Sequence, residues 1–162
     1  MAVHKLQIDD FVTIDYELIA IHSSLEDYRL AYFINRNLQV LLEKCERDLS
    51  IRTTKYKSCF SRFIFEDEDT DTAWNLLHNK SNTTTYNSVA ATTLFSESGQ
   101  DVATTNYLLP ELKKVDYILK VENKPSGCLP KQMTEKLLAV KQITTAYIID
   151  HNKLKSKNNL IF

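Results

Sequence analysis

Glycine is nearly absent from this chain: it occurs twice among 162 residues, and both glycines come late, at positions 99 and 127. A Gly-rich loop, whose backbone amides cradle phosphate groups in nucleotide-binding proteins, is therefore nearly excluded. The Gly-x-Ser-x-Gly turn that presents a catalytic serine is absent as well. Only three prolines are present. With 43% hydrophobic and 25% charged residues, the composition is that of an ordinary soluble globular protein.

Cysteine is also scarce. Cys45, Cys59 and Cys128 form no Cys-x-x-Cys pair, so the sequence predicts neither a zinc site nor a redox motif. Cys45 and Cys59 lie in expected strands, where we expect the free thiol to behave as a small apolar side chain.

No charge of one sign prevails, because the formal net charge is −1. Binding to nucleic acid is therefore not expected from the overall charge. The longest apolar runs fall far short of the roughly 20 residues that cross a bilayer. The amino-terminal stretch MAVHKLQIDDF is charged and has no apolar core of a signal peptide. We expect a cytoplasmic protein without a membrane-spanning segment.

Hydrophobic periodicity predicts two helices among several strands. Ser23 and Glu26 have the spacing of a capping box at the start of a helix that runs to about Asn37. A second helix begins at Pro130 and carries an apolar stripe through residue 140. Strands are expected at residues 11–22, 40–50, 56–66, 73–79, 86–95, 102–109, 115–121 and 143–150, with 81–86 a loop or an edge strand.

This order places a strand–helix–strand unit at each end of the chain and a run of strands between them. We expect a single domain over residues 1–162, of α+β class, with a mostly antiparallel sheet and two helices on one face. The nearest simple architecture is a split βαβ, ferredoxin-like variant with inserted strands.

The stretch LPELKKVDY, from Leu109 to Tyr117, resembles the motif that names the IPExxxVDY family of small bacterial proteins, with Leu109 in place of the isoleucine. The stretches SSLEDYRLAYFIN and LKSKNNLIF also resemble that family. The similarity extends from the first helix to the last residue. It implies no particular activity, cofactor or site.

The same stretch can be interpreted as the corner of a hairpin. Pro110 suits the end of a strand, and residues 111–114 form a polar turn. Tyr117 then points into the core, where its hydroxyl needs a partner, and Asp116 projects to the other face, where a lysine can pair with it. This interpretation leaves only Glu111 without a role.

Motifs for metal or cofactor binding are absent. Asp67, Asp69 and Asp71 alternate as a calcium loop does, but that loop requires glycine at its sixth position and glutamate at its twelfth, where Thr72 and His78 stand. The four histidines have no metal-ligand spacing, and His22, between a strand and a helix, is the most noteworthy of them. We predict no metal, no cofactor and no catalytic residue.

Three functions remain open. The first is a non-catalytic interaction module that binds a protein partner or forms a homo-oligomer through an exposed sheet edge or face. The second is a small-ligand-binding or enzymatic domain with a polar pocket at the start of the first helix and the Pro110 turn. Asp27 falls within the apolar arc of that helix, as does Asn35. The candidate ligand-binding residues are Asp27, Arg29, Glu111, Asp116 and Tyr117.

The third function is RNA association through Lys153, Lys155 and Lys157, which alternate near the carboxyl end. No aromatic residues interleave with these lysines to stack on bases, so nucleic acid is the weakest alternative. The final residues 160–162 are apolar, and leaving them in water would forgo about 1.5–3 kcal/mol for each side chain that could be buried. We therefore expect this tail to dock, with the lysines facing solvent.

Overall fold

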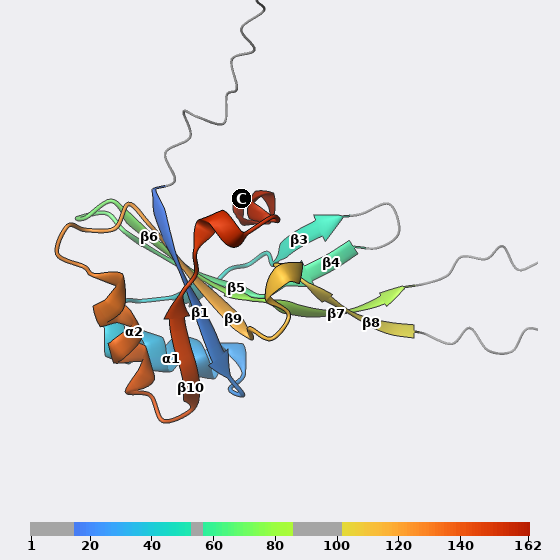
Figure 1. The fold of residues 1–162 in the computed structure, drawn as a ribbon, viewed down its shortest axis with the longest axis horizontal. Coiled ribbons are helices and arrows are strands. Elements are labelled where there is room, and N and C mark those ends of the chain that lie inside the picture. Colours follow the sequence, from blue (N-terminus) through green and yellow to red (C-terminus); the bar gives the residue numbers. More distant parts are fainter. Residues whose placement is uncertain (1–14, 53–56, 86–101) are drawn as a thin grey trace, which may run out of the picture.

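The computed structural model describes residues 15–52, 57–85 and 102–162 (Figure 1). In this part of the chain, α1 (Asp27–Leu38) and α2 (Pro130–Leu138) accompany a mostly antiparallel arrangement of strands. The predicted α+β class is confirmed. The ferredoxin-like split remains a prediction. The strands are β1 (Tyr16–Ser23), β2 (Glu43–Lys44), β3 (Leu49–Arg52), β4 (Lys57–Phe60), β5 (Arg62–Asp67), β6 (Thr72–His78), β7 (Lys80–Thr85), β8 (Val102–Tyr107), β9 (Tyr117–Glu122) and β10 (Ile143–Ile148).

The central feature is a six-stranded sheet with the order β10-β1-β9-β6-β5-β2, in which every pairing is antiparallel. Two hairpins, β3-β4 and β7-β8, lie beside it, and β4 contacts β7 (Figure 1). The sheet therefore has two edges, β10 and β2.

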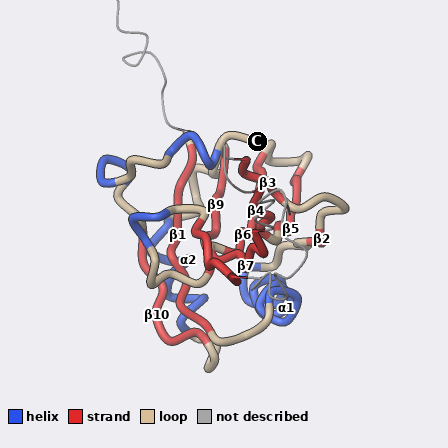
Figure 2. The backbone as a smooth tube through the Cα atoms, turned by 90° about the vertical axis from the view of Figure 1, so that its right-hand side faces the viewer, coloured by secondary structure: helices blue, strands red, loops and turns tan. Residues whose placement is uncertain are grey.

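Both faces of the sheet are covered, by different parts of the chain. One face carries Ile19, Ile21 and Leu119, and packs against α1 and α2, which contact each other. The opposite face carries Leu18 and Ile118. It packs against the 3-10 turn Pro110–Leu112, against Phe60 of β4, and against the C-terminal segment, residues 151–162, through Leu154 and Leu160. Figure 2 shows the two helices and the sheet from the side. Burial on both faces explains why β1 and β9 consist of nearly continuous apolar residues.

The predicted capping box is wrong. Ser23 is the last residue of β1. Glu26 occupies the N-cap position of α1, but its side chain makes no capping hydrogen bond to the helix backbone. The Ser23 hydroxyl donates instead to the carbonyl of Gln142 (3.0 Å) and accepts from the amide of Leu25 (3.2 Å). A tertiary contact across the sheet has replaced the local cap.

The predicted strand over residues 40–50 is also wrong, because two short strands, β2 and β3, belong to different sheets. Asn35 of α1 contributes to this break. Its amide group donates to the carbonyl of Leu42 (3.1 Å) and accepts from the amide of Leu42 (2.8 Å). The backbone polar groups of Leu42 are thus bound by a side chain rather than by a neighbouring strand. The predicted strand over residues 56–66 is wrong in the same way, because β4 and β5 belong to different sheets and Ser61 separates them.

Several other predictions are confirmed. Pro130 is at the start of α2, and β7 occupies most of residues 81–86. The tail docks through Leu160, which is buried, while Ile161 remains exposed. Lys153 and Lys155 face solvent, and Lys157 is partly buried. The predicted strand 86–95 lies outside the described residues.

Candidate functional site

Three of the five candidate residues gather where β1 ends and α1 begins. Asp27, Asp116 and Tyr117 all lie at this junction. The Tyr117 side chain is buried, and its hydroxyl donates to the carbonyl of Leu25 (2.6 Å). Burial, together with the nearby carboxylates of Asp27 and Asp116, raises the pKa of Tyr117 far above its usual value of 10. Tyr117 is therefore a neutral donor that fixes the entry to α1.

Asp116 ties the same junction from the other side. One carboxylate oxygen accepts from the amide of Ser23 (3.0 Å), and the other accepts from the ammonium of Lys80 (2.5 Å). The predicted pairing of Asp116 with a lysine is thus confirmed. Both oxygens are committed to contacts within the chain.

Asp27 belongs to a second polar network. Its carboxylate accepts a short hydrogen bond from the hydroxyl of Ser61 and another from the amide of Tyr28 (2.7 Å). The ammonium of Lys44 donates to Ser61 (2.6 Å) and to Asp48 (2.6 Å). Since Lys44 and Asp48 are both substantially exposed, their ion pair contributes little stability, at most about 1 kcal/mol.

His78 stands between the two networks and was not singled out from the sequence. Its ring stacks on that of Tyr117, with centroids 4.7 Å apart and planes at 17°. Burial lowers the pKa of His78 below 6.5, although the carboxylates of Asp27 and Asp116 oppose this shift. A lone histidine at the end of an apolar strand carries no sequence signal of this placement.

A polar cavity of about 520 Å³ opens at this junction, and His78, Ser61, Cys59 and Lys80 are among its lining residues. The backbone amide of His78 donates to the carbonyl of Ser61 (2.9 Å). Among the described residues, no hydrogen bond joins the His78 ring to the Ser61 hydroxyl or to the Cys59 thiol, so a side-chain pair of nucleophile and base is not present there. Cys59 lies in a strand, β4, as expected, and it is free and exposed rather than packed among apolar side chains.

Glu111 lies away from this cavity and contacts the C-terminal segment. One carboxylate oxygen accepts from the amides of Lys155 and Ser156 (2.8 Å each), and the other accepts from the Ser156 hydroxyl (3.0 Å). Burial alone would raise the pKa of Glu111, but these hydrogen bonds lower it below 4.5. Glu111 therefore attaches the C-terminal segment to the Pro110 turn through Lys155 and Ser156.

Arg29 also lies elsewhere, on the exposed side of α1 beside Tyr28 and Tyr32. The Pro110 turn lines a separate cavity of about 400 Å³. None of the five candidate residues is among the described residues that line these two cavities, so the structure does not bring the five together in one pocket.

The described residues contain no cluster of histidine, cysteine, aspartate or glutamate side chains that could hold a metal ion. Over the same ranges, neither α1 nor α2 is long and apolar enough to cross a bilayer. No family model matches the chain, and neither does a curated protein or a solved structure.

Proposed function

We propose that this protein is a non-catalytic interaction module that forms a homodimer through the outer edge of β10. The observation that carries this proposal is the contrast between the two edges of the sheet. β2 has only two residues, Glu43 and Lys44, and both are charged and exposed. β10 has six residues, ITTAYI, with neither a charge nor a proline. Short, charged edges prevent strand addition, whereas long uncharged edges permit it.

The backbone of β10 offers the necessary groups. The amide of Ile149 donates to the carbonyl of Leu18 (2.8 Å), which defines the alternation of hydrogen bonds along the β1-β10 pair. Because Leu18 and Ile149 form a hydrogen-bonded pair, the pairs Ile19–Ile148 and Ile21–Ala146 are non-hydrogen-bonded ones. The backbone amides and carbonyls of Ala146 and Ile148 therefore point away from β1. Within the described residues, no other strand pairs with β10. A two-fold axis at Ala146 would let each copy satisfy the other's groups.

Apolar side chains accompany this edge. Tyr147 is 39% exposed, Ile148 is 46% exposed, and Leu138 of α2, which packs against β10, is 47% exposed. A second copy would remove these side chains from water, and burial of each would contribute about 1.5–3 kcal/mol at most. The commitment of the Asp116, Tyr117 and Glu111 side chains to internal contacts supports a structural role for the motif.

Light scattering after size-exclusion chromatography tests this proposal. We expect the wild-type chain to be a dimer at micromolar concentration. Ile148→Lys places a charge on the edge and should produce a monomer with unchanged circular dichroism. Ile161→Lys is the matched control, because Ile161 is 77% exposed and lies on the tail rather than on β10. A monomeric wild type, or a dimer that persists in Ile148→Lys, would contradict the proposal.

We also propose that the protein is a bacterial member of the IPExxxVDY family and acts in the cytoplasm. The motif from Leu109 to Tyr117 and the two further stretches of similarity support the family assignment. The free state of Cys45, Cys59 and Cys128 is compatible with a reducing compartment.

A further inference from the structure

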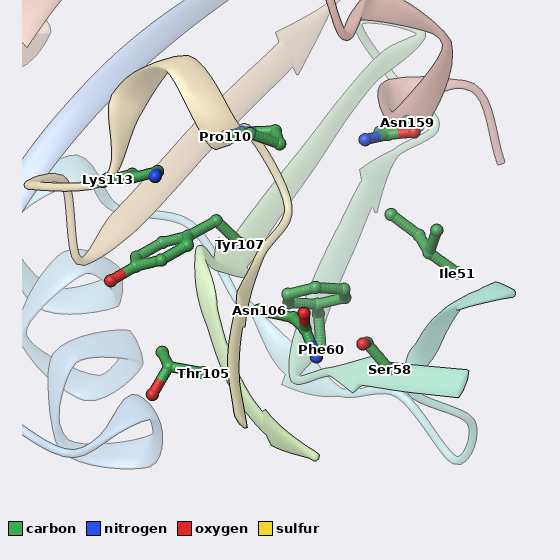
Figure 3. A pocket seen from close by; sticks show the side chains of 9 residues that line it. All are labelled: Ile51, Ser58, Phe60, Thr105, Asn106, Tyr107, Pro110, Lys113 and Asn159. Carbon is green, nitrogen blue, oxygen red and sulfur yellow. The ribbon is translucent and has the colours of Figure 1, made fainter. Parts of the chain in front are cut away.

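We propose that the cavity beside Pro110 binds a small organic anion with an apolar body, such as a carboxylate attached to an aromatic ring or a short alkyl chain. This site is independent of the β10 edge. The cavity measures about 400 Å³, which lies within the usual range for small-molecule sites. It lies among the β3-β4 hairpin, β8, the Pro110 turn and the C-terminal segment (Figure 3).

The walls of the cavity favour an apolar body. Ile51 of β3 and Tyr107 of β8, both half-buried, line the cavity together with Pro110, which adds a rigid ring. Phe60 of β4 also belongs to the wall, where the surrounding chain buries it almost fully and holds its ring in one position. A flat or extended hydrocarbon group can pack against such a wall without first ordering it.

The charge at the cavity favours an anion. Among the described residues that line the cavity, Lys113 is the only charged one. Among the described residues, no carboxylate pairs with its ammonium group. This distinguishes Lys113 from Lys80, which lines the other cavity and whose ammonium group is already bound to Asp116. A ligand carboxylate would supply Lys113 with a counter-ion.

Asn106 supplies a second, independent indication of a ligand. Its side-chain nitrogen is buried and has no hydrogen-bond partner in the described part of the chain. Buried polar groups are nearly always hydrogen-bonded, so this donor needs an acceptor. Asn106 is among the residues that line the cavity, so this unpaired donor lies beside the space that a ligand would occupy.

Titration of the full chain with phenylacetate and hexanoate, followed by amide-detected NMR, tests this inference. Phenylacetamide and hexanol are the matched uncharged probes. We expect both carboxylates at millimolar concentration to shift the side-chain amide signals of Asn106 and the backbone signal of Tyr107, and the uncharged probes to bind far more weakly. The Ile148→Lys variant should give the same shifts, because β10 does not line this cavity.

Lys113→Gln should weaken carboxylate binding about tenfold, because a hydrogen bond to a charged group is lost. Lys114→Gln is the matched control, since this exposed neighbour does not line the cavity. The inference is overturned if phenylacetamide binds as tightly as phenylacetate, if both lysine variants bind equally, or if none of the probes shifts Asn106.

Discussion

The ammonium of Lys120 lies 2.8 Å from the carbonyl oxygen of Leu160 and joins the middle of the sheet to the C-terminal segment. Lys120 is only 4% exposed, although it follows three apolar or aromatic residues of β9 and precedes Val121. Glu122 pairs with the same ammonium, and the rings of Tyr16 and Phe162 lie 4.9 Å and 4.7 Å from it. This buried charge is therefore compensated by an ion pair, a hydrogen bond and two aromatic faces.

Replacement of Lys120 by methionine should lower the free energy of unfolding by roughly 1–3 kcal/mol, because the Leu160 carbonyl loses its charged donor while the apolar stem is kept. Urea denaturation measures the change. Lys124→Met is the control: its ion pair with Glu17 (3.2 Å) is partly exposed and should contribute at most about 1 kcal/mol. Equal losses in the two variants would argue against the role given to Lys120.

Leu160→Ala should lower the free energy of unfolding by about 2–5 kcal/mol, because Leu160 packs against the sheet with 1% exposure. Ile161→Ala should change it by less than about 0.5 kcal/mol, since Ile161 is exposed. Thermal unfolding of the two variants is a direct comparison. If Leu160→Ala leaves the melting temperature unchanged, the tail does not contribute to the stability of the sheet.

Glu111→Gln should loosen the C-terminal segment and make its attachment independent of acid. The pKa of Glu111 is lowered in the folded chain, so its contribution is present above about pH 4.5 and is lost as pH falls through the folded pKa. The protection of the amides of Lys155 and Ser156, measured as hydrogen exchange relative to the intrinsic rate at the same pH, should decrease in acid in the wild type. In the variant, exchange should already be fast at neutral pH. Full protection in Glu111→Gln would contradict the attachment.

Mild acid should destabilise the protein through two histidines. Burial is the main cause that lowers the pKa of His78, and it is also the main cause for His151. The Nδ1 atom of His151 is buried and has no hydrogen-bond partner among the described residues. The unfolded chain then binds these protons at a higher pH than the folded chain does. Stability is therefore greatest above about pH 6.5 and falls as pH drops below it. Urea denaturation near neutrality and near pH 5.5 measures the difference. The His78→Gln/His151→Gln variant should depend less on pH, and an unchanged dependence would refute this origin.

Neutralising Lys153, Lys155 and Lys157 should leave the affinity for single-stranded RNA unchanged in a fluorescence titration. The backbone amide of Lys155 binds Glu111, and the tail serves as a cover for the sheet. A wild-type affinity that falls with salt at a slope of about 0.7 per phosphate contacted, and that vanishes in the triple variant, would instead establish RNA association.

The alternation of apolar and polar residues predicted that Tyr117 points into the core with a hydroxyl that needs a partner, and that Asp116 can pair with a lysine. The particular partners, Leu25 and Lys80, could not be predicted from it. Alternation determines which face of a strand a side chain occupies, and burial then requires the tyrosine hydroxyl to find a partner. Local sequence could not predict the role of Glu111, because its partners lie 44 and 45 residues further along the chain. Contacts between residues so far apart in the sequence leave no local pattern from which they could be predicted.

The errors have the same origin. Ser23 and Glu26 have the spacing of a capping box, but Ser23 donates to a carbonyl 119 residues away instead. Asn35 is a polar residue on an apolar helix face, and its amide binds the backbone of Leu42 and so contributes to the break in the predicted strand. His78 was missed because its stacking on Tyr117 depends on the pairing of β6 with β9. Tertiary contacts overrode local preferences in each case.

The position of β1 between β9 and β10 has a consequence for biosynthesis. Ile19 pairs with Leu119 and with Ile148, which are 100 and 129 residues further along the chain. Both neighbours of this apolar strand therefore leave the ribosome long after it does, and loops of that length close slowly. Until residue 117 has emerged, the nascent chain carries the segment Leu18–Ile21 without either of its neighbouring strands, and such a segment is prone to aggregation. The central sheet therefore cannot be completed before residue 148 has been synthesised, and chaperones that shield hydrophobic nascent segments should bind this chain early.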